Sequence, residues 1–177
     1  VNIIGGLGNQ MFQFALYLAL RNRFPSEEIK IFTGAYKGYS KHNAYELDRV
    51  FGLSAPEATR ADMRRLAYPY LNYRMWQIGF HLLPQRSTML NEKIFGHYYP
   101  EAFDKADCYY DGYWQNERYF ADIRQEILMA YTPISIDQRN ASVARKLTTC
   151  NSVSIHVRHG DFLDKKIYRG ICDIDYY

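Results

Sequence analysis

The first 33 residues contain a short apolar run, a glycine-rich turn, a long apolar segment and a second short alternating run. Three of residues 1–4 are β-branched and apolar (Val1, Ile3 and Ile4), and this run predicts a buried strand. Residues 9–23 predict a helix that ends before Pro25, and residues 28–33 predict the next strand. A strand, a turn, a helix and a second strand form the opening of a doubly wound α/β domain, so the sequence predicts that fold class.

The turn between the first strand and the helix contains Gly6 and Gly8, and Asn9 is predicted to cap the helix. A dinucleotide fingerprint needs a third Gly or Ala in this turn, where the chain has the bulky Met11, so we reject that interpretation. The N–H groups of a helix start still attract anions. Asn9 and Gln10 add side-chain donors beside them.

The remaining pattern alternates between helical and extended segments. The sequence predicts helices over residues 46–51, 57–67, 68–83, 116–130 and 137–149, and strands over residues 107–112 and 152–157. For residues 68–83, which are rich in aromatic side chains, we expect a packed helix and keep a sugar-stacking platform as the alternative.

The last predicted strand ends in a polar turn that carries His156, Arg158, His159, Gly160 and Asp161. Proteins with α/β sheets bind ligands at the carboxyl ends of their strands. The planar guanidinium of Arg158 can hold a phosphate through two parallel hydrogen bonds. The alternative is a solvated arginine followed by ordinary turn chemistry at Asp161.

Composition limits the class of protein. Hydrophobic residues make up 47% of the 177 residues, which is typical of a folded chain, and the net charge of +3 is too small to indicate nucleic-acid binding. The three cysteines have neither metal-ligand nor disulfide spacing, which favours a reducing compartment. No signal peptide or membrane-spanning run is present in the sequence, so we expect a cytoplasmic protein. Because both ends look trimmed, we expect a fragment.

Three motifs in order resemble those of the α-1,2-fucosyltransferases, glycosyltransferase family 11. Residues 4–15, IGGLGNQMFQFA, are similar to the N-terminal signature of that family, and residues 111–120, DGYWQNERYF, to its central motif. Residues 156–161, HVRHGD, resemble its H-x-R-R-x-D motif. The resemblance therefore spans the whole chain.

The resemblance implies a two-lobed GT-B-type architecture, with residues 1–150 as the acceptor-side lobe and residues 151–177 as the truncated start of the donor lobe. It implies transfer of L-fucose from GDP-fucose to the O2 of a terminal galactose, with inversion and without a metal or other cofactor. The implied partners are GDP-fucose and a galactose-terminated glycan, with peripheral contact to the inner face of a bacterial membrane as an open alternative.

The resemblance also assigns roles to residues. Arg158 would hold the GDP phosphates, His156 and His159 would contact the donor, and Asp161 would help polarise it or accept a proton. Since negative charge grows on the departing phosphate, an arginine can replace a metal ion there. The glycine turn would face the cleft from the other lobe through Gly6, Gly8, Asn9 and Gln10.

Several alternatives remain open at this stage. The family motif has a second Arg where this chain has His159, so a catalytically degenerate carbohydrate- or nucleotide-binding module is the main rival. A nicotinamide oxidoreductase is disfavoured, because residues 33–34 supply no acidic side chain after the second strand. A metal site at His156 and His159 lacks further ligands, and helix capping explains Asp173 and Asp175 as well as a metal would.

Overall fold

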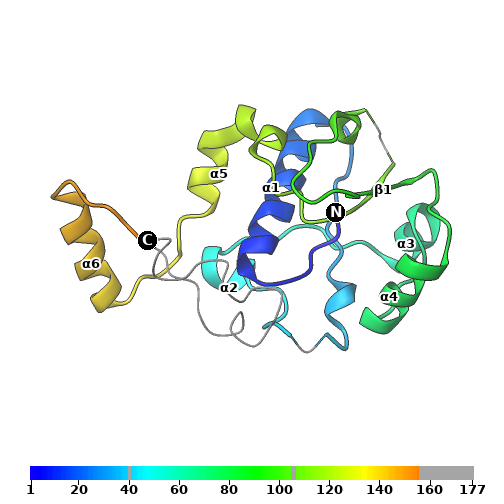
Figure 1. Cartoon of the computed structure of the whole chain (residues 1–177), viewed down its shortest axis with the longest axis horizontal. Coiled ribbons are helices and arrows are strands. Elements are labelled where there is room, and N and C mark those ends of the chain that lie inside the picture. The colour runs from blue at the N-terminus through cyan, green and yellow to red at the C-terminus, as the bar shows by residue number, and fades with distance from the viewer. Residues whose placement is uncertain (40, 105–106, 156–177) are drawn as a thin grey trace, which may run out of the picture. The chain divides into compact units, whose positions relative to one another are not determined.

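The computed structural model describes residues 1–39, 41–104 and 107–155 (Figure 1). Contacts divide the chain into two compact units, Val1–Ser135 and Ile136–Tyr177. The first unit mixes helices with a small parallel sheet, so the α/β class is confirmed. The two-lobed architecture and the lobe boundary near residue 150 stay predictions.

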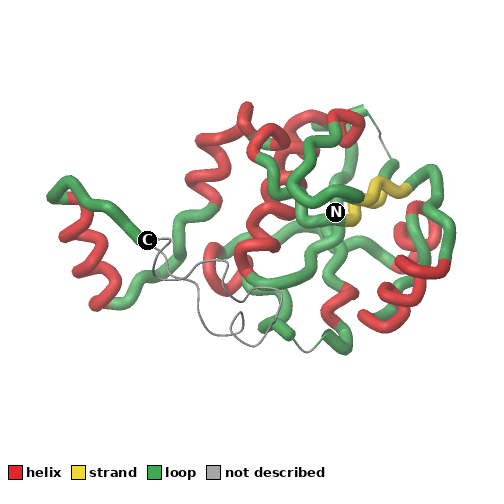
Figure 2. The backbone as a smooth tube through the Cα atoms, in the orientation of Figure 1, coloured by secondary structure: helices red, strands yellow, loops and turns green. Residues whose placement is uncertain are grey.

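The helices and strands are short apart from the first helix (Figure 2). In chain order they are α1 Leu7–Arg23, α2 Leu47–Phe51, α3 Arg60–Leu66, α4 Tyr73–Leu82, β1 Met89–Asn91, β2 Tyr109–Asp111, α5 Arg124–Ala130 and α6 Gln138–Thr148. Short 3₁₀ turns lie at Gly34–Tyr36, Pro100–Phe103, Glu117–Tyr119 and Ala121–Ile123.

The sheet is wider than its two named strands. β1 pairs with β2 in parallel, and the Asn2 N–H donates to the Tyr110 carbonyl at 2.9 Å. Single parallel bridges join Asn2 to Phe32 and Ile31 to Glu57. The extended segments therefore lie side by side in the order 56–58, 31–32, 1–4, β2, β1. Chain order reverses between residues 1–4 and β2, which makes this the topological switch point of the sheet.

Side chains along these segments alternate between two hydrophobic cores, as the period of two in a strand requires. One core packs on α1 and includes Val1, Ile3, Ile31, Leu90 and Tyr110. The other lies on the α3 and α4 side and includes Ile4, Phe32, Met89 and Tyr109. The sheet is thus covered on both faces, which is the layering of a doubly wound domain.

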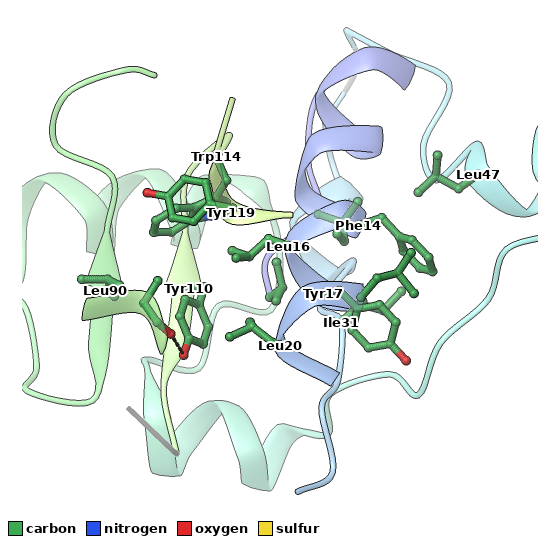
Figure 3. Close-up of a cluster of buried hydrophobic side chains, with 14 residues drawn as sticks. Phe14, Leu16, Tyr17, Leu20, Ile31, Leu47, Leu90, Tyr110, Trp114 and Tyr119 are labelled. Carbon is green, nitrogen blue, oxygen red and sulfur yellow. Dashed lines mark hydrogen bonds between the residues drawn. The ribbon is translucent and has the colours of Figure 1, made fainter. Parts of the chain in front are cut away.

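The first helix is buried on all sides over residues 14–20. Figure 3 shows Leu16 and Leu20 on the side of Tyr110, and Phe14 and Tyr17 on the side of Ile31. A helix that is apolar all round belongs in the interior of a domain. α1 is therefore the central packing element of the first unit.

The predicted N-cap of this helix is wrong. α1 begins at Leu7 with the extended Gly6 as its N-cap, and no side chain caps it. Asn9 lies inside the first turn, and its side chain accepts a hydrogen bond from Gln115 instead. The glycine turn is two residues shorter than predicted, because its last two residues are already helical.

The predicted start of the 57–67 helix is also wrong. α3 begins at Arg60, because Thr59 and Asp62 form a reciprocal capping box in which the Asp62 N–H donates to Thr59 Oγ1 at 3.1 Å. Glu57 instead continues the sheet beside Ile31. The predicted helix over residues 116–130 is broken into two 3₁₀ turns and α5.

The second unit contains α6, which confirms the helix predicted over residues 137–149. Asp137 Oδ1 caps it by accepting from the Asn140 N–H at 2.8 Å. Residues 151–155 form no strand in the structure, and Val153 and Ile155 are 89% and 67% exposed. The predicted buried strand is therefore wrong over its described part. A strand buries a face only against paired neighbours, and no described residue pairs with this one.

Candidate functional site

The glycine turn and the loop after β2 meet at the switch point of the sheet. Gln115 Nε2 donates to Asn9 Oδ1 at 2.8 Å, so side chains 106 residues apart in sequence are joined directly. Beneath them, the buried Gln13 accepts from the Ile4 N–H at 3.0 Å and donates to the Gly112 carbonyl at 2.9 Å. One amide thus ties the ends of two adjacent extended segments to α1. This edge is where α/β sheets bind ligands.

The three glycines of the turn have different surroundings. Gly5 has a φ of 93°, and its carbonyl accepts from Tyr36 Oη at 2.7 Å. A Cβ on Gly6 would lie 3.3 Å from His42 Nδ1, whereas a Cβ on Gly8 would meet no heavy atom within 4 Å. Gly8 is exposed and lies in the first turn of α1, so this position is the open approach to the backbone N–H groups.

Gln10, which the sequence predicts to contact substrate, lies inside the protein with no exposed surface. Its Nε2 donates to the carbonyls of Gly5 and Ala44 at 3.0 and 2.8 Å, and its Oε1 accepts from the Glu46 N–H at 2.8 Å. A direct contact with substrate would break these bonds. In this structure Gln10 shapes the glycine turn, while Gly8 and Asn9 are partly or fully exposed beside it.

The loop after β2 is held by one carboxylate. Glu92 Oε2 accepts from the N–H groups of Tyr113 and Trp114 at 2.7 and 3.2 Å. Trp114 is fully buried with a left-handed φ of 57°, a conformation that costs a non-glycine residue energy. A Cβ on Gly112 would lie 2.5 Å from the Glu92 Cβ, so the tight approach requires glycine there.

Asp111, the last residue of β2, is a buried carboxyl that the sequence analysis did not single out. Its oxygens accept from Asn2 Nδ2 at 2.9 Å and from Trp76 Nε1 at 3.2 Å. Burial raises the pKa of Asp111 to about 6, because the two hydrogen bonds only partly offset the loss of water. The signal in the sequence was an acidic residue ending an apolar strand.

Four of the predicted site residues lie outside the described residues. These are His156, Arg158, His159 and Asp161, and Asp173 and Asp175 lie there too. Their assignments stay predictions. Over residues 1–39, 41–104 and 107–155, no group of three or more His, Cys, Asp or Glu side chains comes together as a metal site would require. Within the same ranges, no helix is both long and apolar enough to cross a membrane.

The arrangement defines an α/β domain in which the glycine turn and the loop after β2 meet at the switch point of the sheet. Residues 95–177 match the family described as glycosyl transferase family 11, which covers the second and third motifs. The chain is 28% identical over 182 residues to an alpha-1,2-colitosyltransferase of Escherichia coli. The resemblance to glycosyltransferase family 11 that the motifs indicated is thereby confirmed.

The match to that relative covers 99% of this chain and 60% of the relative. The chain therefore spans about three fifths of the length of the enzyme it matches. No solved structure matches the chain.

Proposed function

We propose that this chain is the acceptor-side part of a glycosyltransferase that moves L-fucose from GDP-fucose to the O2 of a terminal galactose. The observation that supports this most is the meeting of the glycine turn with the loop after β2, joined by Asn9 and Gln115. These two segments carry two of the three family motifs, and the family match covers the second and third.

Transfer of fucose from GDP-fucose requires a positively charged group beside the departing nucleotide. As the bond to fucose breaks, negative charge grows on the β-phosphate of GDP and must be stabilised. We assign this to the guanidinium of Arg158, with His156 and His159 contacting the donor. The acceptor hydroxyl attacks from the opposite face, which inverts the anomeric centre, and its proton passes to Asp161.

A second candidate differs only in the donated sugar. The E. coli relative is named for transfer of colitose in an alpha-1,2 linkage, so a colitose donor is the alternative to GDP-fucose. The rival class is a degenerate binding module that has lost activity through His159. In either case we expect the protein to work in the cytoplasm, with peripheral membrane contact as an open question.

The proposal is tested with the full-length protein, GDP-fucose and lactose, with the product analysed by mass spectrometry and by methylation linkage analysis. We expect addition of one fucose at O2 of galactose. Arg158→Ala should lower the rate by about 10²–10³-fold, the usual cost of losing a charge-stabilising contact. Arg139→Ala, an exposed arginine of α6, is the matched control and should leave the rate unchanged.

Three outcomes separate the candidates. Transfer from a GDP-colitose donor but not from GDP-fucose would favour the colitose reaction. No transfer by the natural sequence, with activity gained in His159→Arg, would favour the degenerate module. Full activity of Arg158→Ala would refute the role given to the guanidinium.

A further inference from the structure

Four aromatic rings form a row beside the switch point. Tyr39, Tyr73, Trp76 and Phe80, called here the aromatic row, follow one another with ring centroids 4.5, 5.9 and 5.6 Å apart. The ring plane of Trp76 is nearly parallel to those of Tyr73 and Phe80, with interplanar angles of 19° and 25°. Residues 73, 76 and 80 of α4 share one helix face, because they are three and four residues apart.

Two members of the aromatic row, Tyr39 and Trp76, connect it to the candidate site. The ring of Tyr39 lies 5.6 Å from His42, the side chain that faces Gly6 of the glycine turn. Trp76 Nε1 donates to Asp111 Oδ2 at 3.2 Å, at the end of β2. The row therefore extends from the first motif to the second.

Backbone and packing contacts of α4 also fix the position of the rings. The Tyr73 N–H donates to the Lys37 carbonyl at 2.8 Å, which joins α4 to the loop that carries Tyr39. Gly79 is the one buried residue of α4, and a Cβ there would lie 2.3 Å from the Tyr70 ring. Close packing through Gly79 fixes the orientation of the helix, so the row is preorganised without being covered.

Tyr39, Tyr73 and Trp76 pack with part of their surface against the second core and keep the rest exposed. Trp114, an aromatic residue of the core, has no exposed surface, whereas Tyr39, Tyr73 and Trp76 are half-buried and Phe80 is 45% exposed. Aromatic rings with a polar edge favour ligands that have both an apolar face and hydroxyl groups. A pyranose has this chemistry, because its axial C–H bonds form an apolar face and its hydroxyls lie at the rim.

We propose that the aromatic row is the platform on which the acceptor glycan lies, with a pyranose ring stacked on Trp76 or Tyr73. This rests on the proposed glycosyl transfer, and it identifies the residues that contact the acceptor. Asp111 acts in it as a positioning residue, since its carboxylate holds the Trp76 indole in place. The row then leads the glycan toward Gly8 and Asn9 at the switch point.

The kinetic test uses Trp76→Leu and Tyr73→Leu in the full-length protein. We expect the KM for lactose to rise about tenfold, which corresponds to the loss of an aromatic contact of about 1.4 kcal/mol, with the KM for GDP-fucose unchanged. Trp76→Phe, which keeps a ring, should restore most of the affinity. Ile78→Ala is the matched control, because Ile78 is 57% exposed on α4 and lies outside the row. Transfer with an unchanged KM for lactose in both Leu variants would overturn the proposal.

A binding test needs no transfer and so separates this proposal from the proposed function. Lactose titrated into the protein should change the tryptophan fluorescence, and Trp76→Phe should abolish the change. If transfer is absent from every assay and this signal remains, the proposed function fails while the platform stands. Absence of both lactose binding and transfer would overturn the platform. Binding of phosphatidylglycerol vesicles that depends on Phe80, with lactose kinetics unaffected, would assign the row to a membrane and also overturn it.

Discussion

Gln13 contacts the ends of two neighbouring extended segments at once, by accepting from the Ile4 N–H and donating to the Gly112 carbonyl. These segments carry the first and second motifs, and their order along the sheet reverses between them. The consequence is that a helix residue in the interior sets the distance between two loops at the surface. Asn9 and Gln115, which meet above it, depend on that spacing.

Replacing Gln13 tests this buried link. Gln13→Leu removes the partners of two buried backbone groups, each of which costs about 1–3 kcal/mol when left unsatisfied. We expect the free energy of unfolding to fall by about 2–5 kcal/mol, measured by urea denaturation. Gln125→Leu is the control, because Gln125 is exposed on α5 and should change stability by less than about 0.5 kcal/mol. Equal stability of the two variants would contradict the role of Gln13.

The pKa of Asp111 makes a prediction about stability against pH. Its pKa is raised from 3.8 to about 6 in the folded state, so the folded protein binds the extra proton more tightly than the unfolded chain. The stability contribution is therefore complete below pH 4 and is lost as the pH rises through 6. A shift of about two units corresponds to about 3 kcal/mol.

Asp111→Asn removes this titration. Between pH 4 and pH 7 we expect the natural protein to lose about 2–3 kcal/mol of unfolding free energy relative to the variant. Asp62→Asn is a matched control of opposite sign. The Thr59 hydrogen bonds lower the pKa of Asp62 to about 2, so its contribution is lost as the pH falls below 4. A pH-independent difference for Asp111→Asn would show that this carboxyl does not titrate as stated.

The sequence predicted the parts of the fold that local patterns specify. The C-terminal end of α1, the short helix α2, the strand at β2 and the helix α6 are all confirmed. Each of these has a cap, a breaker or a long apolar period within its own segment. Their formation depends little on residues far away in the chain.

Two of the failures involve short extended segments. β1 has three residues and showed no period of two. Residues 57–58 looked like the start of a helix because Pro56 precedes them. Such segments are strands only because a neighbour pairs with them, and single-sequence patterns do not contain that information. For the same reason Gln13 and Asp111 were not identified from the sequence. Their roles depend on hydrogen-bond partners that lie far away in the sequence and come close only in the fold.

Gly8 permits a prediction that separates folding from function. An added Cβ would meet no atom within 4 Å, and alanine is the better helix former by about 1 kcal/mol, so Gly8→Ala should leave stability equal or slightly higher. If substrate approaches the turn at this open position, the same methyl group should lower the transfer rate about tenfold or more. The thermal midpoint and kcat/KM for lactose measure the two effects.

Gly112→Ala is the contrasting variant. Its Cβ would lie 2.5 Å from the Glu92 Cβ, so this substitution should lower stability as well as activity. Glycine would then be needed at position 112 for close packing and at position 8 for the approach of substrate. Unchanged kcat/KM in Gly8→Ala would place the substrate away from the turn.

The last prediction concerns metal dependence. The departing GDP needs a positive counter-charge, which a metal-dependent transferase takes from a divalent cation and which we assign to Arg158. Transfer should therefore persist in EDTA and should not rise on addition of Mn²⁺ or Mg²⁺, whereas Arg158→Ala should be inactive under both conditions. Asp173→Asn and Asp175→Asn should keep the natural rate, because these carboxylates cap a helix in our interpretation. The opposite result would be activity that is lost in EDTA, restored by Mn²⁺ and lowered by either Asn variant. It would assign the counter-charge to a metal ion held by this Asp pair instead of to the guanidinium.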